Sequence, residues 1–155
     1  MRKRESSGLP AGGLLAIVNR LPNLAPPSFH FSLLVFHFMG KSVLREKSYA
    51  FAVRIMNFCR MLQDTKKEYI VSKQLLRSGT GIGALLREAE FAQSRPDFVH
   101  KVSIALKEAN ETIYWLQLLT DTNYIPGVET TDLQLECNEL IAMLAATVKT
   151  AKKAV

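Results

Sequence analysis

The sequence predicts an all-α protein, an antiparallel up-down-up-down four-helix bundle preceded by an irregular N-terminal extension. Three observations support this fold class. Apolar residues recur at steps of three and four, capping signals divide the chain into four segments, and no segment has a convincing strand pattern. The connections between segments are short, which favours antiparallel neighbours. An apolar fraction of 48% in 155 residues suffices for one buried core.

The first two helices are predicted from one apolar stripe each. The first stripe follows Leu44 and continues through Phe51, Ile55, Phe58 and Leu62, with Cys59 beside it. Thr65 and Glu68 have the spacing of a capping box, so we expect the second helix to begin there. Its inward side carries Val71, Leu75, Ile82, Leu85, Leu86 and Ala89.

The third helix has the clearest pattern in the chain. Ser94 and Asp97 form a weaker capping pair, with Pro96 in the first turn. The stripe then alternates steps of four and three through Phe98, Val102, Ala105, Ala109, Thr112, Leu116 and Leu119, and Val99, Leu106 and Ile113 widen it.

The fourth helix is predicted to follow a break at Pro126 and Gly127. Thr131 and Gln134 have capping-box spacing and place the start of this helix. Its inward residues are Leu133, Cys137, Leu140, Leu144 and Val148. We expect a few residues in each of the first two connections and about eight in the third.

Residues 1–38 differ from the rest, and we expect a poorly structured extension there, with the bundle domain at residues 39–155. The basic start and the apolar stretch at 14–18 imitate a signal peptide, but Asn19 and Arg20 end that stretch early. Our hypothesis is that translation starts at Met39 and that the upstream part is an over-extended reading frame. A flexible tail is the alternative, and an intact mass beginning at Met1 would contradict the start-site hypothesis.

The cysteine count and the length of the apolar runs indicate the cellular compartment. Cys59 and Cys137 lie far apart within helical patterns, which predicts buried thiols rather than a disulfide framework or a metal knuckle. No apolar run approaches the roughly 20 residues that a bilayer-spanning helix needs. We therefore expect a cytoplasmic protein with no membrane association.

Two patterns resemble cofactor and metal sites. Gly79, Gly81 and Ala84 fit a dinucleotide fingerprint, but that motif needs a preceding strand, and both flanks here are helical. Small residues that admit a neighbouring backbone explain them better. Asp97 and His100 have the spacing of one metal-ligand pair, whereas a di-iron bundle requires two. The sequence thus predicts neither a cofactor nor a metal, with Asp97 as a capping carboxylate.

Paired carboxylates are the remaining candidate for catalysis. Glu108 and Glu111 share a helix face, but no nucleophile, histidine or phosphate loop converges on them in the sequence. We therefore predict no catalytic residues and no enzyme. A nucleic-acid-processing enzyme that uses these carboxylates and Arg77 is the alternative.

The same helix carries a second stripe outside its core seam, comprising Ile104, Glu108, Glu111, Trp115 and Leu118, with Lys101 at its start. An exposed Trp and aliphatic residues among charges are typical of a subunit interface. Scattered apolar surface residues would give the same spacing.

Charge divides the bundle unequally. Residues 41–91 hold ten basic and five acidic side chains, a balance of +5, whereas residues 92–155 hold six and eight, a balance of −2. This distribution predicts sequence-independent contact with the phosphates of RNA or DNA. A solvated face, or a complement to another subunit, would also account for it. The candidate nucleic-acid-binding residues are Lys47, Arg54, Arg60, Lys66, Lys67, Lys73, Arg77 and Arg87.

Several motifs together resemble one bacterial family. The stretch from Gln74 to Leu119, which includes RSGT at 77–80 and KEANET at 107–112, resembles the core signature of the 23S rRNA intervening-sequence proteins. KSYAFA at 47–52 is similar to that family's opening helix. Gly81 and Leu85 stand where the family pattern has Ser and Asn, so this chain lacks those polar groups.

The resemblance implies a small cytoplasmic four-helix bundle that assembles as a homopentamer and has no established enzymatic activity. It also implies a fold similar to the accessory protein of diversity-generating retroelements, which binds a reverse transcriptase and nucleic acid. With the charge split, it predicts a non-enzymatic oligomer that associates with RNA or DNA. The alternative is an interaction scaffold for a protein partner without nucleic-acid binding.

Overall fold

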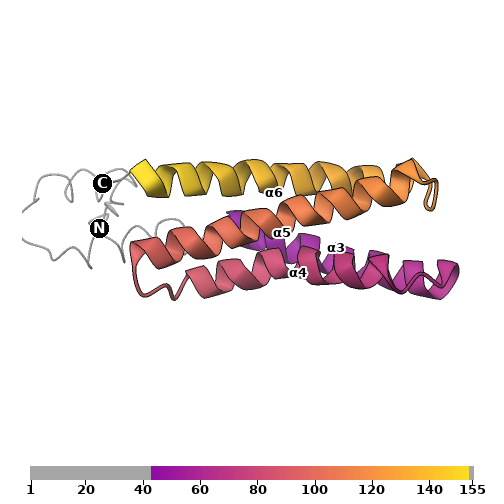
Figure 1. Cartoon of the computed structure of the whole chain (residues 1–155), viewed down its shortest axis with the longest axis horizontal. Coiled ribbons are helices and arrows are strands. Elements are labelled where there is room, and N and C mark those ends of the chain that lie inside the picture. The colour runs from indigo at the N-terminus through magenta and orange to yellow at the C-terminus, as the bar shows by residue number, and fades with distance from the viewer. Residues whose placement is uncertain (1–42, 154–155) are drawn as a thin grey trace, which may run out of the picture.

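The computed structural model describes residues 43–153, which form a bundle of four helices. Figure 1 shows an elongated bundle in which each helix runs back alongside the one before it. No strand occurs within residues 43–153. The predicted extension at 1–38 and the predicted start at Met39 lie outside the described residues. The helices are α3 (Val43–Lys66), α4 (Val71–Ala89), α5 (Arg95–Asp121) and α6 (Gly127–Lys153).

One apolar core runs along the bundle axis, as the stripes predict. The seven α5 residues at four-three spacing are buried, because this spacing returns each side chain to the same face, whereas Val99, Leu106 and Ile113, which widen the stripe, are half-buried. Val71, Leu85 and Val148 are half-buried against this core rather than fully inside it. The buried polar residues include Ser48, Ser72, Ser78, Thr112, Thr130 and Thr147.

The start of α4 differs from the prediction. Thr65 lies inside the last turn of α3, where its Oγ1 donates to Met61 O at 2.8 Å, so it is not a cap. The cap is Glu68, whose carboxylate accepts from the backbone N–H groups of Ile70, Val71 and Ser72 at 2.9, 2.9 and 2.6 Å. A carboxylate replaces the hydroxyl because its two oxygens accept from three otherwise unpaired amides.

The α4–α5 connection confirms the second capping prediction. Ser94 Oγ accepts from the N–H of Asp97 at 3.3 Å, and Asp97 Oδ2 accepts from the N–H of Gln93 at 3.1 Å. The next residue, Arg95, reaches the far end of α6, where its Nε donates to Ala151 O at 2.7 Å. This contact ties the start of α5 to the end of α6.

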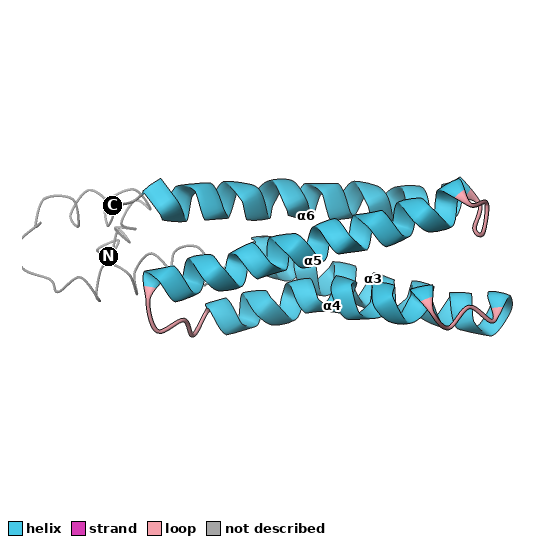
Figure 2. Cartoon of the chain, in the orientation of Figure 1, coloured by secondary structure: helices cyan, strands magenta, loops and turns pink. Residues whose placement is uncertain are grey.

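The start of α6 is a second correction. The helix begins at Gly127, and Thr131 Oγ1 donates to Gly127 O at 2.8 Å within it, so Thr131 and Gln134 are not its capping box. The connection before it is residues 122–126, shorter than predicted. Gly127 follows Pro126 as the first helical residue rather than part of a break. All three connections are short, as Figure 2 shows.

Gly79 confirms the packing explanation of the glycine-rich run. A Cβ at this position would lie 2.9 Å from Cγ2 of Ile55, closer than packed atoms approach. The side chain of Ile55 therefore fills the space over the α4 backbone, and both residues are buried. Here the absence of a side chain allows α3 and α4 to pack closely.

Candidate nucleic-acid interface

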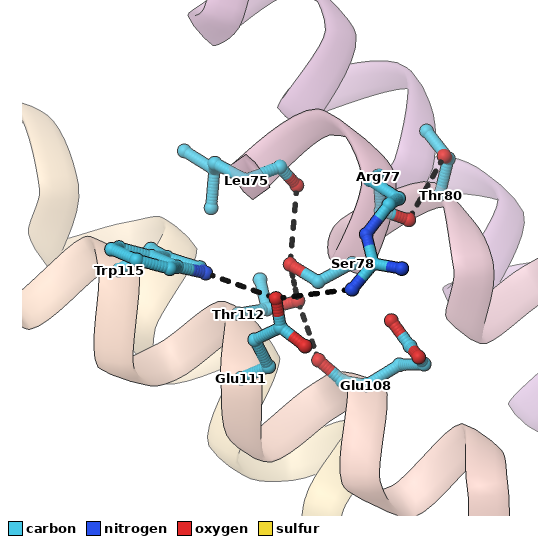
Figure 3. A network of polar contacts seen from close by, with 8 residues as sticks. All are labelled: Leu75, Arg77, Ser78, Thr80, Glu108, Glu111, Thr112 and Trp115. Atoms are coloured by element: carbon cyan, nitrogen blue, oxygen red, sulfur yellow. Dashed lines mark hydrogen bonds and ion pairs between the residues drawn. The ribbon is translucent and has the colours of Figure 1, made fainter. Parts of the chain in front are cut away.

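The two motifs of the predicted signature meet across the α4–α5 seam. Ser78 and Thr112 are fully buried, with their hydroxyl oxygens 3.0 Å apart. Thr112 Oγ1 also lies 2.8 Å from Glu108 O, and Ser78 Oγ lies 3.4 Å from Leu75 O. Figure 3 shows these residues as one chain of polar contacts between the helices. Their inward position makes this part of the signature a packing element.

On the outer side of the same seam, one carboxylate holds an arginine and a tryptophan. Glu111 Oε1 lies 3.5 Å from Nη2 of Arg77 and accepts from Nε1 of Trp115 at 3.2 Å (Figure 3). Trp115 is half-buried and packs against the core, so the prediction of an exposed Trp is wrong. The indole N–H donates to the carboxylate of Glu111, one turn earlier, and this hydrogen bond orients the ring along α5.

Glu108 lies one turn before Glu111 on α5 and points toward α4 (Figure 3). Its Oε2 would be 3.4 Å from a Cβ at Gly81, so the missing side chain of Gly81 leaves room for this carboxylate. Among residues 43–153, no cation is paired with it. Ile104 and Leu118, the other members of the predicted interface, are half-buried on α5.

Three of the eight predicted nucleic-acid-binding residues are engaged in ion pairs. Lys47 Nζ lies 2.8 Å from Glu139 Oε2, and Arg54 is paired with Glu136. These contacts join α3 to α6, whereas the third engaged cation, Arg77, is held by Glu111 on α5. The basic residues therefore do not form one continuous free face.

The other five predicted residues are exposed and have no described carboxylate as a partner. Three of them surround the α3–α4 connection, where Asp64 and Glu68 offset part of their charge. Lys67 has φ 53°, a left-handed conformation that L-residues with a Cβ adopt at a cost. The five residues are Arg60, Lys66, Lys67, Lys73 and Arg87.

The sequence analysis, which used charge alone, did not identify two exposed aromatic side chains near these cations. Tyr49 lies on α3 and Tyr69 in the α3–α4 connection, and both are more than half exposed. The signal was present in the sequence, since Tyr69 lies between Lys67 and Lys73, and Tyr49 follows Lys47. Aromatic residues interleaved with cations are typical of surfaces that bind single-stranded nucleic acid.

The described part of the chain gives little support for a reactive cysteine, a metal site or a membrane-spanning helix. Burial raises the pKa of Cys59, with a smaller contribution from the charge of Glu68, and burial raises that of Cys137; both reach about 12. The thiols are therefore poor nucleophiles. Residues 43–153 contain no group of three or more His, Cys, Asp or Glu side chains suited to a metal. No helix in this range has the length and apolarity needed to cross a bilayer.

The comparisons with known proteins agree on one family. The family described as 23S rRNA-intervening sequence protein matches residues 41–146. A solved structure of a protein of unknown function, from the S23 ribosomal protein family of Bacteroides thetaiotaomicron VPI-5482, is 50% identical and has a TM-score of 0.68. That match covers 69% of this chain and 99% of the other. No curated protein matches the chain. The chain therefore belongs to the 23S rRNA-intervening sequence protein family.

Proposed function

We propose that the protein is a non-enzymatic, oligomeric bundle that associates with RNA or DNA in the cytoplasm. The observation that carries the proposal is the set of five exposed cations on α3, α4 and their connection that no described carboxylate neutralises. Free Lys and Arg side chains release condensed counterions from a polyanion when they bind it. The family description names a 23S rRNA intervening sequence and is consistent with a nucleic-acid partner.

The ion pairs refine which residues contribute. Lys47, Arg54 and Arg77 each have a carboxylate beside them, so a phosphate gains less from these cations. The α3–α4 connection contributes more, because Lys66, Lys67 and Lys73 cluster there. The left-handed backbone at Lys67 supports a functional reason for lysine at a position where glycine is less strained.

The test is the salt dependence of binding to RNA, measured by fluorescence anisotropy with a single strand and a duplex of equal length. Replacing Lys66, Lys67 and Lys73 by Gln should weaken binding and reduce the log–log salt slope by about 0.7 per lost contact on a single strand and about 0.9 on a duplex. Undetectable binding at low salt would refute the proposal.

A matched control removes the same charge elsewhere. Lys149, Lys152 and Lys153 lie on α6, and all three are exposed. Their replacement by Gln changes the net charge equally but leaves the α3–α4 hairpin intact. Equal losses from both triple variants would show that only total charge matters and would contradict a localised interface.

A second candidate function is that of a protein interaction scaffold. It is favoured by the half-buried carboxylate of Glu108, which lacks a described cation and lies near Ile104 on one side and Glu111 and Trp115 on the other. Leu118 extends this face. A second copy, as in the homopentamer that the resemblance implies, or a reverse transcriptase would supply the missing cation.

Partner affinity at low and high salt separates the two candidates, and light scattering of the parent and of Glu108→Gln, Ile104→Ala and Trp115→Ala reports on assembly. A scaffold predicts loss of assembly in these variants and partner affinity that survives high salt. A monomeric parent would refute the oligomer.

A further inference from the structure

A shallow groove runs between α3 and α4 on the outside of the basic hairpin. Its volume is about 230 Å³. Its depth depends on Gly83, where a Cβ would lie only 3.6 Å from Ser48 O, and on small neighbours. The lining residues are Ser48, Tyr49, Ala52, Thr80, Gly83, Ala84 and Arg87.

The groove has a ring on one wall and a cation on the other. Tyr49 comes from α3 and is 63% exposed, so most of its surface is available to a ligand. Arg87 comes from α4, is exposed, and is paired with no described carboxylate. At the nearby end of the hairpin, Arg45 Nη1 lies 3.2 Å from Glu90 Oε1, so that cation is already neutralised.

The serine and threonine hydroxyl groups of the groove are already engaged. Ser48 Oγ donates to Arg45 O at 2.9 Å, and Thr80 Oγ1 donates to Leu76 O at 2.7 Å. Their protons are therefore unavailable to a ligand, and only their oxygen lone pairs remain. The side-chain donors left to a ligand are the Tyr49 hydroxyl and the Arg87 guanidinium, a set that suits a base face and a phosphate better than the hydrogen-bonding edge of one base.

We propose that this groove binds single-stranded nucleic acid, with a base stacked on Tyr49 and the adjoining phosphate paired with Arg87. The inference rests on the proposed function and names the site and the kind of strand. An aromatic ring beside a free guanidinium is the combination that single-strand-binding surfaces use, and its stacking tolerates any base. Arg87 and the other exposed cations without a described carboxylate partner provide the charge complementarity.

A duplex does not fit this arrangement. Its bases are stacked on one another, so neither base face is available to Tyr49. A duplex would contact the exposed lysines through its phosphates alone. The groove therefore predicts that the protein binds a single strand more tightly than a duplex. The lysines of the α3–α4 connection alone would not give this preference, because they contact the phosphates of both.

The experiment measures the affinity of a fluorescent ten-nucleotide oligouridylate and of a ten-base-pair RNA duplex for four proteins. Tyr49→Ala should weaken single-strand binding about 5- to 150-fold, the range for loss of one stacked base, and leave duplex binding unchanged. Tyr49→Phe should retain single-strand affinity, because the ring persists. Tyr124→Ala is the control, since this exposed tyrosine lies in the α5–α6 connection.

Two further variants test the opposite wall. Arg87→Gln should lower the single-strand salt slope by about 0.7, as expected for one lost phosphate contact. Ala84→Leu places a larger side chain on the exposed rim of the groove and should block the base while retaining helix propensity. Unchanged single-strand affinity in both variants would overturn the assignment of the groove.

The outcomes distinguish this inference from the proposed function. No binding of either RNA by the parent defeats the function itself. Parent binding that Tyr49→Ala leaves unaltered, or weakens equally for both RNAs, overturns the stacking site while the electrostatic function stands. A Tyr49→Ala variant with normal RNA binding but a changed mass in light scattering also overturns it, because another copy of the chain would then cover the groove.

Discussion

The hydroxyl oxygens of Ser78 and Thr112 lie 3.0 Å apart in the interior of the bundle, where neither residue is exposed to solvent. They join the two sequence motifs, one on α4 and one on α5, at the point where the helices pack. A buried hydroxyl without a partner is costly, and Ser78 depends more on Thr112 than the reverse, because Thr112 also bonds the carbonyl of Glu108.

Thr112→Val should destabilise the protein by about 1–3 kcal/mol, because it removes the partner of Ser78 and leaves a buried hydroxyl poorly paired. Ser78→Ala should cost less, since Thr112 retains the carbonyl of Glu108. The double variant should be more stable than the sum of the single effects by about 0.5–1 kcal/mol. Urea denaturation of the four proteins measures this coupling, and strict additivity would show that the pair does not interact.

Gly79→Ala and Gly83→Ala form a matched pair with opposite expected signs. At Gly79 the new methyl group would meet Ile55, and we expect a net loss of about 1–2 kcal/mol from overpacking. At Gly83 its nearest neighbour would be Ser48 O at 3.6 Å, an ordinary contact, so the gain in helix propensity of about 0.5–1 kcal/mol should remain. Thermal or chemical unfolding tests the pair, and destabilisation by both would contradict the described geometry.

Acid should weaken the cap of α4. Burial acts to raise the pKa of Glu68, but hydrogen bonds from Val71, Ser72 and Ile70 outweigh it, and the net pKa lies below the ordinary value of 4.5. The charged form is therefore favoured by folding, and its contribution to stability is present above pH 4.5. That contribution is lost as the pH falls from there through the lowered pKa.

Glu68→Gln retains an acceptor oxygen but removes this titration. Its unfolding free energy, compared with that of the parent from pH 7 to pH 2, should show a deficit at neutral pH that shrinks below pH 4.5. Asp64→Asn is the control, because Asp64 is exposed and has no described hydrogen bond. A constant difference across the range would show that the charge of Glu68 does not stabilise the cap.

Both cysteines should be unreactive in the folded protein. The pKa of about 12 for Cys59 and Cys137 leaves almost no thiolate at pH 8, and both side chains are buried. Labelling with iodoacetamide should therefore require unfolding, with both sites modified together in denaturant. Fast labelling of either cysteine in the native protein would contradict the packing around it.

The periodicity of apolar residues predicted which face of each helix is buried, but it did not identify the polar residues on those faces. Ser48 lies between Leu44 and Phe51 at steps of four and three, and Thr147 follows Leu144 in the same way. Both are buried, yet hydrophobicity alone gives them no weight. Their hydroxyl groups are tolerated because each donates to a carbonyl of its own helix, Arg45 O and Met143 O.

Helix starts were harder to predict than helix faces. The spacing between Ser or Thr and an acid or amide three residues later marks a cap only when the first residue leaves the helix. Ser94 does so with extended backbone, whereas Thr65 and Thr131 remain helical and bond to carbonyls one turn back. Sequence alone does not distinguish these two uses of a hydroxyl.

The candidate site was predicted as a set of charges, and the part that could not be foreseen is their pairing. The sequence gives Arg54 and Lys73 the same prediction, that of a phosphate-binding cation. In the structure Arg54 is paired with Glu136, more than eighty residues away in the sequence, whereas Lys73 is paired with no described acid. Such pairing depends on which helices become neighbours and in what register.

The ion pairs of Lys47 and Arg54 connect the first described helix to the last, across a groove between α3 and α6. A polyanion that recruits these two cations must displace Glu139 and Glu136, so closing this seam and holding phosphate compete for the same side chains. Glu136→Gln with Glu139→Gln would free both cations, tightening polyanion binding while loosening the seam. The acids of α6 thus limit how strongly these two cations can hold a polyanion.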